Sequence, residues 1–349
     1  MNHRFFLGSC SCEGFVSHYD SLLQDVKDLT IIKGGSGCGK STFMKAIGKA
    51  AEEKGFSVSY IPCSSDPDSL DGVLIPELSI GYVDGTAPHV LEPIVCGGSA
   101  NYLNFGEFYD REAMKPNEEQ ILSLHKKNKH QYDLVHRCMS SLRGLLDCIR
   151  WETDSPSYEE EMKAIGECLC LSGLKPKFGV GTQSRRFLAA LTPKGPQVCH
   201  TTPAALCPKV YVLKDDYCLA PKVISLVEEK ALSYGYGCIS CYTPFVPHTF
   251  PSYLLIPELE VSFVSDSKFF PYEGDYFCSI DLNSTLSPRI RKELAFVHKT
   301  TEELLSVVIG HLGTAKELHD RMERLCKPFV NFEKITAFTD HTIATRFCK

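Results

Sequence analysis

A glycine-rich loop between an apolar run and a helix-favouring run constrains the fold of this chain most. The apolar run is Leu29–Lys33, the loop with its flanking polar residues is Gly34–Thr42, and the helix-favouring run is Phe43–Lys54. The loop fits the pattern G-x-x-x-x-G-K-[ST] at every defined position. The sequence therefore predicts a buried strand, a tight turn and a helix, which together are typical of an α/β domain.

The residue types in this loop suit the binding of a phosphate chain. Glycines allow backbone N–H groups to approach an anion closely, and the N-terminus of the next helix favours negative charge. We expect Lys40 to reach the β- and γ-phosphates of ATP and Ser41 to ligate Mg²⁺. The structural alternative is a glycine-rich turn that binds nothing. The predicted binding residues are Gly34, Gly35, Ser36, Gly37, Cys38, Gly39, Lys40, Ser41 and Thr42.

Length and charge narrow the class of protein. The chain has 349 residues, enough for about two domains, and its net charge of −6 argues against a nucleic-acid or anionic-membrane surface. No apolar run approaches the roughly 18 residues that a membrane helix needs. The first ten residues faintly suggest a lipoprotein signal, but their apolar stretch is too short for one, so we expect a strand over 4–8 instead.

Cysteine usage predicts a reducing, cytoplasmic location. The count of 17 is odd, which favours free thiols over a disulfide framework. Cys238 and Cys241 fall in a predicted strand, where their side chains would point to opposite faces, so buried packing is favoured over a zinc site. Within the glycine-rich loop, we expect Cys38 to fill space and to make the loop sensitive to oxidation.

An internal repeat organises the whole chain. Leu-Ile-Pro-Glu-Leu occurs at 74–78 and again at 255–259, an offset of 181 residues, and the same offset pairs Ile31–Lys33 with Val212–Lys214. We infer two tandem P-loop NTPase-like domains, each a three-layer α/β fold with a mainly parallel sheet. The predicted ranges are 1–178 and 185–349.

The second half does not keep the phosphate-binding residues. At the same offset Gly34 is replaced by Asp215, Gly35 by Asp216 and Lys40 by Pro221. Two carboxylates in such a pocket would repel an anion. Lys222 stands one position later than the lysine of the first half. The second site is therefore predicted to be degenerate and not to bind a nucleoside triphosphate in the usual way.

An acidic residue follows an apolar run at 79–83. Asp84 precedes Gly85 and fits the Walker-B pattern, in which an acid helps to hold Mg²⁺. We predict that Asp84 and Ser41 form the metal site, the alternative being an aspartate that only shapes a turn. In the second half the offset places Ser265 at this position.

Three further side chains are candidates for catalysis beside Lys40 and Asp84. Asp66 and Asp68 lie in the polar loop 63–72, where a carboxylate could bind an acceptor or take its proton. The alternative for both is turn and helix-cap chemistry. His89 follows Asp84 by five residues and could sense the γ-phosphate or act as a base, or be purely structural.

Long helices are predicted over 117–151 and 288–325, and further strands over 56–62 and 74–83. Basic residues in the first of these helices offer either a lid cation for phosphoryl transfer or a solvated face. No arginine can be assigned to the transition state, and Arg185 and Arg186 are candidates only by their position near the seam.

With these motifs in place, the chain resembles a little-characterised bacterial family of tandem P-loop proteins described as ATPases or nucleotide kinases. The resemblance covers essentially the whole chain and is most specific over 4–110, through the loop, Cys63–Gly72, Leu74–Leu78 and Val83–Val90. It implies ATP binding by Gly34–Thr42 and no particular substrate. Family members carry a phosphate loop in both halves, so this chain departs from them in its second half.

The sequence therefore predicts a Mg-dependent ATP-binding protein that hydrolyses ATP at one site in its N-terminal half. Two alternatives stay open: a kinase that transfers the γ-phosphate to a small molecule or nucleotide, and a nucleotide-sensing switch with negligible turnover. The predicted partner is a nucleoside triphosphate, without membrane or nucleic acid. An unidentified small-molecule or protein partner and a homo-oligomer are left open.

Overall fold

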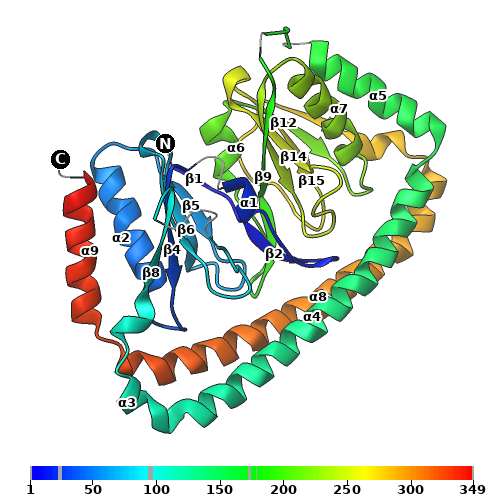
Figure 1. The fold of residues 1–349 in the computed structure, drawn as a ribbon. Coiled ribbons are helices and arrows are strands. Elements are labelled where there is room, and N and C mark those ends of the chain that lie inside the picture. Colours follow the sequence, from blue (N-terminus) through cyan, green and yellow to red (C-terminus); the bar gives the residue numbers. More distant parts are fainter. Residues whose placement is uncertain (1, 23–25, 93–96, 172–173, 178, 348–349) are drawn as a thin grey trace. The chain divides into compact units, whose positions relative to one another are not determined.

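The computed structural model describes residues 2–22, 26–92, 97–171, 174–177 and 179–347 (Figure 1). They belong to two compact units, each built from segments far apart in the sequence. Unit 1 comprises Met1–Gly8, Tyr19–Val135 and Gly310–Lys349, and unit 2 comprises Ser9–His18 and His136–Ile309. The division passes through the two long helices α4 (Glu118–Thr153) and α8 (Pro288–Cys326), so each helix contributes to both units.

Unit 1 contains a six-stranded sheet with the strand order β1-β5-β6-β7-β4-β8. Only β6 is antiparallel to its neighbours. The prediction of one strand region over 74–83 is wrong, because Ser79 adopts a φ of 51° after a short 3-10 helix and the chain turns back. The strands are β1 (His3–Arg4), β4 (Asp28–Lys33), β5 (Ser59–Pro62), β6 (Leu70–Ile75), β7 (Ile80–Asp84) and β8 (Ala100–Asn104).

Unit 2 repeats this topology strand for strand. Its sheet has the order β9-β13-β14-β15-β12-β16, with β14 antiparallel to both neighbours. Glu260 adopts a φ of 56° at the position that corresponds to Ser79. The predicted α/β architecture with two mainly parallel sheets is thus confirmed. The strands are β9 (Thr182–Phe187), β12 (Lys209–Lys214), β13 (Gly237–Tyr242), β14 (Tyr253–Ile256), β15 (Val261–Asp266) and β16 (Cys278–Asp281).

Two small sheets and several short helices complete the described elements. The expected strand over 4–8 is interrupted, because β1 ends at Arg4 and the next strand begins at Gly8. The two-stranded sheets are β2 (Gly8–Ser11) with β3 (Gly14–Ser17) and β10 (Ala189–Thr192) with β11 (Gly195–Val198). The short helices are α1 (Tyr19–Leu22), α3 (Arg111–Met114), α6 (Thr201–Leu206), η1 (Pro76–Leu78), η2 (Phe105–Phe108), η3 (Lys115–Asn117), η4 (Pro257–Leu259), η5 (Leu282–Thr285) and η6 (Lys327–Phe329).

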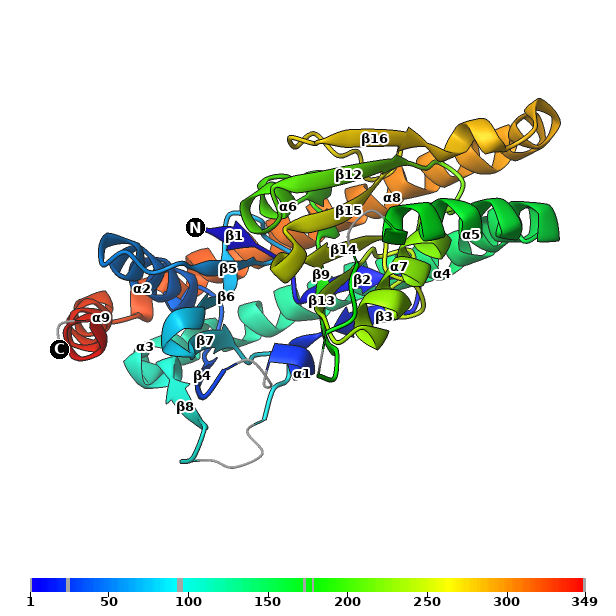
Figure 2. The same cartoon turned by 90° about the horizontal axis from the view of Figure 1, so that it is seen from above.

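The two halves of the chain exchange their terminal helices. Helix α5 (Pro156–Leu171) follows α4 in the first half, but it packs on α7 (Ala220–Ser233) of unit 2, as Figure 2 shows. Helix α9 (Phe332–Phe347) follows α8 in the second half, but it packs on α2 (Lys40–Glu53) of unit 1, as Figure 1 shows. The units therefore do not coincide with the contiguous ranges 1–178 and 185–349.

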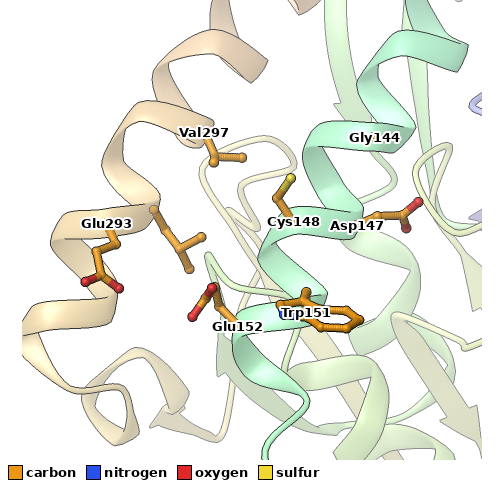
Figure 3. A pocket seen from close by; sticks show the side chains of 8 residues that line it. Gly144, Asp147, Cys148, Trp151, Glu152, Glu293 and Val297 are labelled. Atoms are coloured by element: carbon orange, nitrogen blue, oxygen red, sulfur yellow. The ribbon is translucent and has the colours of Figure 1, made fainter.

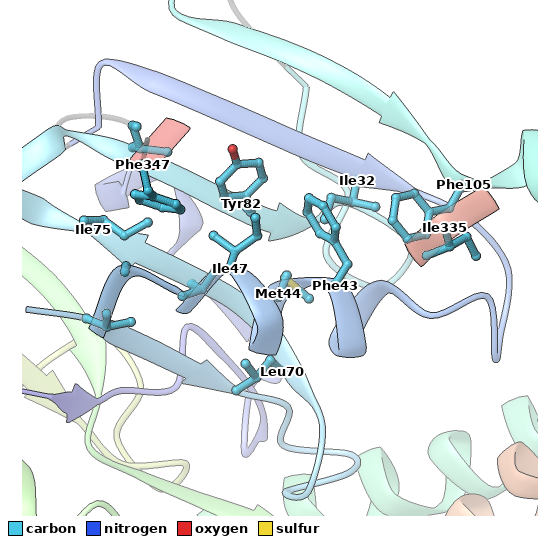
Figure 4. Packing of buried hydrophobic residues seen from close by; sticks show 14 of the residues in the cluster. Ile32, Phe43, Met44, Ile47, Leu70, Ile75, Tyr82, Phe105, Ile335 and Phe347 are labelled. Atoms are coloured by element: carbon cyan, nitrogen blue, oxygen red, sulfur yellow. The ribbon is translucent and has the colours of Figure 1, made fainter. Parts of the chain in front are cut away.

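The core of unit 1 lies on both faces of its sheet. On one face α2 buries Phe43 and Met44 against the strands, and α9 adds Ile335 and Phe347 to the same cluster (Figure 4). Phe43 packs edge to face on Tyr82 with ring centroids 5.4 Å apart. On the other face a second cluster forms from Leu7, Tyr19, Val26, Leu29, Ile31, Ile61, Leu74, Val83, Leu91 and Ala100. This apolar packing holds the carboxyl ends of β4 and β7 beside each other.

The long helices predicted over 117–151 and 288–325 are confirmed as α4 and α8. Within unit 1 they run antiparallel, since Leu124 packs on Leu318 and Met322, while Asn128 Nδ2 donates a 2.8 Å hydrogen bond to the carbonyl of Ala315. In the part of the chain that the structure describes, no helix has the length and apolar character needed to cross a membrane.

Candidate functional site

The glycine loop, Gly34–Gly39, joins β4 to α2 in unit 1. Gly37 and Gly39 adopt φ values of 74° and 87°, a conformation that side chains with a Cβ rarely take. A Cβ at Gly34 would lie only 2.7 Å from Cys38 Sγ. Gly39 is the N-cap residue of α2, and it has no side chain that could accept a hydrogen bond from the first N–H groups of the helix. The loop has the backbone shape of an anion site at a helix N-terminus.

Lys40 lies across the mouth of this loop. Its Nζ donates hydrogen bonds to the carbonyls of Gly34 at 2.7 Å and Gly35 at 3.1 Å, and it is 3.4 Å from Asp84 Oδ2. The side chains of Lys40 and Asp84 are 13% and 14% exposed. The sequence-predicted lysine and acid are thus brought together at the ends of β4 and β7.

Asp84 and Ser41 each accept hydrogen bonds that orient them. Asp84 Oδ1 accepts from the backbone N–H of Thr86 at 2.8 Å and from the Thr86 hydroxyl, which is the turn role that the sequence offered as the alternative. Its other oxygen faces Lys40. Ser41 Oγ accepts a 2.9 Å hydrogen bond from the N–H of Leu70, the first residue of β6. The antiparallel strand β6 therefore borders the site directly.

Strand β6 also supplies an acid that sequence reasoning missed. Asp71 Oδ2 lies 3.1 Å from His89 Nε2, and both side chains are 8% exposed. Burial alone lowers the pKa of His89, but the charge of Asp71 and the hydrogen bond to it raise that pKa above its ordinary value. The sequence predicts a polar loop over 63–72, whereas the structure begins β6 at Leu70, and all six residues of that strand are buried.

The loop that carries Asp66 and Asp68 lies beside α2. Asp66 Oδ2 accepts a 2.9 Å hydrogen bond from Ser69 Oγ and lies 3.6 Å from Lys316 Nζ of α8. The carbonyl of Asp68 accepts a hydrogen bond from Lys45. The structure thus brings Asp66 close to the Ser41 side of the site, through the neighbouring Ser69 and Leu70. Its carboxylate already has two partners, so it is not poised as an unoccupied base.

Side chains from distant segments hold the outer surface of the glycine loop. Tyr109 Oη donates a 2.9 Å hydrogen bond to the carbonyl of Ser36. A Cβ at Gly37 would lie 3.3 Å from the carbonyl oxygen of Glu323 and 3.2 Å from Cγ of Lys327. The end of α8 and the start of η6 therefore touch the loop. No pattern in the sequence pointed to these contacts.

The expectation that Cys38 makes the loop sensitive to oxidation needs correction. Cys38 is 1% exposed, and its burial raises the pKa of its thiol. A buried thiol with a raised pKa forms little thiolate and reacts slowly. Among the described residues the fifteen cysteines are free thiols, and both Cys238 and Cys241 are buried in β13, as predicted.

The corresponding loop of unit 2 contains its own anion. The buried Asp215 carboxylate accepts hydrogen bonds from the N–H groups of Tyr217 at 3.0 Å, Leu219 at 2.9 Å and Ala220 at 2.7 Å. Burial raises its pKa although these three hydrogen bonds oppose the shift. Asp216 points elsewhere and accepts from the N–H of Lys268. The sequence suggested that these two acids share one pocket, and the structure shows that they do not. The carboxylate of Asp215 instead accepts hydrogen bonds from the N–H groups of the loop.

Lys222 does not replace the lysine of the first loop. Its Nζ donates a 3.0 Å hydrogen bond to the carbonyl of Thr153 and pairs with the carboxylate of Asp154 at the end of α4. Arg150, one of the basic residues of α4, pairs with Asp147 in the same unit at 3.5 Å. Lys222 is thus held at the end of α4, and Arg150 is held on the surface of that helix, both within unit 2.

A cavity of about 430 Å³ lies elsewhere in unit 2, between α4 and α8, and includes the exposed Trp151 (Figure 3). It contains none of the predicted site residues. Within the described ranges, no three His, Cys, Asp or Glu side chains are grouped so that they could hold a metal ion by themselves. Comparison of the chain with protein-family models, with curated proteins and with solved structures gave no match.

Proposed function

We propose that unit 1 binds Mg-ATP on the glycine loop and hydrolyses it. The observation that carries this proposal is the position of Lys40, which lies over the Gly34 and Gly35 carbonyls and 3.4 Å from Asp84. A lysine at the first turn of a helix, beside a glycine-rich loop and an acid, suits a triphosphate. When the nucleotide binds, Lys40 Nζ donates its hydrogen bonds to phosphate oxygens in place of the Gly34 and Gly35 carbonyls.

The donor atoms beside the loop fit a magnesium ion. Mg²⁺ binds oxygen, keeps several waters and commonly uses one or two protein ligands together with substrate phosphates. Ser41 Oγ and the Asp84 carboxylate provide such oxygens, and both are oriented by backbone N–H donors. When bound, the ion would offset the negative charge of the phosphate chain.

Phosphate release from Mg-ATP, measured beside Lys40→Ala, tests the proposal. We expect steady release by the natural chain, and loss of both nucleotide affinity and turnover in the variant. Lys49→Ala is the matched control, because Lys49 lies on the same helix with a side chain that is 77% exposed and pairs only weakly with Glu53. Unchanged Mg-ATP affinity in Lys40→Ala would contradict the proposal.

The same measurement separates the alternatives. ATP binding without phosphate release points to a kinase that lacks its acceptor or to a nucleotide-sensing switch. A kinase regains turnover when an acceptor is added, and Asp66→Asn then reduces transfer without weakening nucleotide binding. A switch shows a nucleotide-dependent change in shape, which small-angle scattering measures, without turnover in any condition.

A further inference from the structure

We propose that Lys316 of α8 is a catalytic residue of unit 1 that donates a hydrogen bond to the transferred phosphoryl group. Asp66 and Asp320 hold it beside the site until nucleotide binds. This inference rests on the proposed function and deepens it. It assigns the cation that the sequence left unassigned, and the residue comes from the second half of the chain.

The position of α8 is the first observation. Lys316, Asp320, Glu323 and Lys327 follow one another at spacings of four, three and four residues, so they share one face of the helix and its extension. At one end of this stripe Lys316 lies 3.6 Å from Asp66. At the other end the carbonyl oxygen of Glu323 and Cγ of Lys327 lie 3.3 Å and 3.2 Å from the position of a Cβ on Gly37. The stripe therefore runs from the Asp66 loop to the glycine loop, along the edge that carries the site.

A short chain of contacts links Lys316 to the predicted magnesium ligand. Lys316 Nζ lies 3.6 Å from Asp66 Oδ2, and the same oxygen accepts a 2.9 Å hydrogen bond from Ser69 Oγ. The next residue, Leu70, donates its N–H to Ser41 Oγ at 2.9 Å. Lys316 thus lies on the γ-phosphate side of the site, where Ser41 and Asp84 would meet the metal and the end of the triphosphate.

The partners of Lys316 are carboxylates only, among the contacts that the structure gives it. Its Nζ is 2.6 Å from Asp320 Oδ1, and its side chain is 25% exposed. Burial lowers its pKa, but the hydrogen bond to Asp320 and the charges of Asp66, Asp320 and Glu323 outweigh this and raise the pKa above its ordinary value. Lys316 is therefore charged, and a flexible four-carbon stem lets its ammonium group move to a stronger anion.

Two other lysines near the site have backbone carbonyls among their partners. Lys33 Nζ donates to the carbonyls of Gly85 at 2.8 Å and Leu91 at 3.3 Å and lies 3.2 Å from Glu92 Oε1, and Lys45 donates to the carbonyl of Asp68. These bonds tie each lysine to one place in the fold. Lys316 instead sits between two acids that a polyphosphate can replace.

The chemistry of the step is simple. The oxygen of a water molecule bonds to the γ-phosphorus while the bond to the β–γ bridging oxygen breaks, and the electron pair leaves on ADP. The proton of the water passes to the released phosphate. Lys316 forms no covalent bond, and its N–H groups stabilise the negative charge on the γ-phosphoryl oxygens. Its departure also frees the Asp66 carboxylate.

Turnover and analogue binding by Lys316→Met test the proposal, because methionine keeps much of the apolar stem. We expect kcat to fall roughly 100-fold or more. Binding of MgADP should be unchanged, whereas affinity for MgADP with aluminium fluoride, a mimic of the transferring group, should fall with kcat. Lys316→Arg should recover part of both. Lys299→Met is the control, because Lys299 lies on α8 with a side chain that is 77% exposed.

Asp66→Asn gives an independent test with the opposite sign. Removing a carboxylate that competes for Lys316 should tighten Mg-ATP binding several-fold, and weaker binding would overturn the idea of competition. A kcat within twofold of the natural chain in Lys316→Met, with normal thermal unfolding, would overturn the role of Lys316. That result differs from failure of the proposed function, in which the natural chain itself binds no Mg-ATP.

Discussion

The carboxylate of Asp215 and the backbone N–H of Ala220, the first residue of α7, form a 2.7 Å hydrogen bond within unit 2. Two more N–H groups of the same loop bond to this carboxylate. A side chain thus occupies the position that an external anion would take at a helix N-terminus. The amides of this loop are therefore satisfied by a carboxylate of the same loop.

We predict that Asp215→Ala destabilises unit 2 by roughly 2–4 kcal/mol, because it leaves buried N–H groups without an acceptor. Inorganic phosphate should then raise the unfolding temperature of the variant more than that of the natural chain. Asp216→Ala is the control and should cost less, since Asp216 accepts a hydrogen bond from Lys268 only at the edge of the loop. Identical unfolding of Asp215→Ala and the natural chain would show that the amides do not need this acid.

The Asp71–His89 pair predicts a pH dependence of stability in unit 1. The pKa of His89 is raised by Asp71 against the effect of burial, so the folded state binds its proton more tightly than the unfolded chain does. The stabilisation is complete below the unfolded pKa of about 6.5 and is lost as the pH rises through the higher folded value. The unfolding temperature of the natural chain, measured from about pH 6 upward, should therefore fall once the pH exceeds the unfolded histidine pKa of about 6.5.

The control for this prediction removes the titrating group. In His89→Gln the decline in unfolding temperature over the same pH range should be smaller, because glutamine does not titrate. An NMR titration of His89 gives a direct check. A folded-state pKa at or below the ordinary histidine value would contradict the expected direction.

Sequence reasoning succeeded where the signal is local or repeated. The turn of the glycine loop could be predicted because Gly37 and Gly39 adopt the positive φ values that it needs. Both sheets could be predicted because the internal repeat pairs equivalent strands, which occur in the same order in the two units. It missed β6, since Leu70–Ile75 is buried on both faces and shows no alternation of polar and apolar residues. Its apolar part, Val73–Ile75, is too short to distinguish a strand by itself, and the predicted strand region joined it to the following strand.

The exchange of α5 and α9 could not be predicted for a different reason. Helical periodicity shows that a helix has an apolar face, but it does not show which partner covers that face. Nothing in the spacing of Ile335 and Phe347 distinguishes α2 from α7 as their neighbour. The same limit hid Lys316, whose contact with Asp66 depends on the path of a helix that begins in unit 2.

Gly37→Ala tests the packing of the glycine loop against the end of α8. The φ of 74° at Gly37 costs an alanine about 1–2 kcal/mol, and its Cβ would also press on the carbonyl of Glu323 at 3.3 Å. We therefore expect lower stability and a loss of Mg-ATP affinity of about tenfold, the equivalent of roughly 1.4 kcal/mol. Isothermal titration with Mg-ATP measures the latter.

Gly55→Ala is the matched control for that variant. Gly55 has a φ of 86°, but a Cβ there would meet nothing within 4 Å. Gly55→Ala should therefore lose stability through its positive φ, as Gly37→Ala does, but leave the affinity for Mg-ATP unchanged. Equal affinities in the two variants would indicate that contact with α8 has no bearing on the loop.

Ile335→Ala tests whether the exchanged helix α9 supports the site. Ile335 is 5% exposed in the core of unit 1, and its Cδ1 is 3.7 Å from the position of a Cβ on Gly39. Truncation of a buried isoleucine costs about 2–5 kcal/mol, so the unfolding temperature and the affinity for Mg-ATP should both fall. Lys334→Ala, at an exposed position on the same helix, is the control. If Ile335→Ala lowers stability but nucleotide binds as before, α9 serves only to cover the apolar face of α2, and the glycine loop keeps its shape without it.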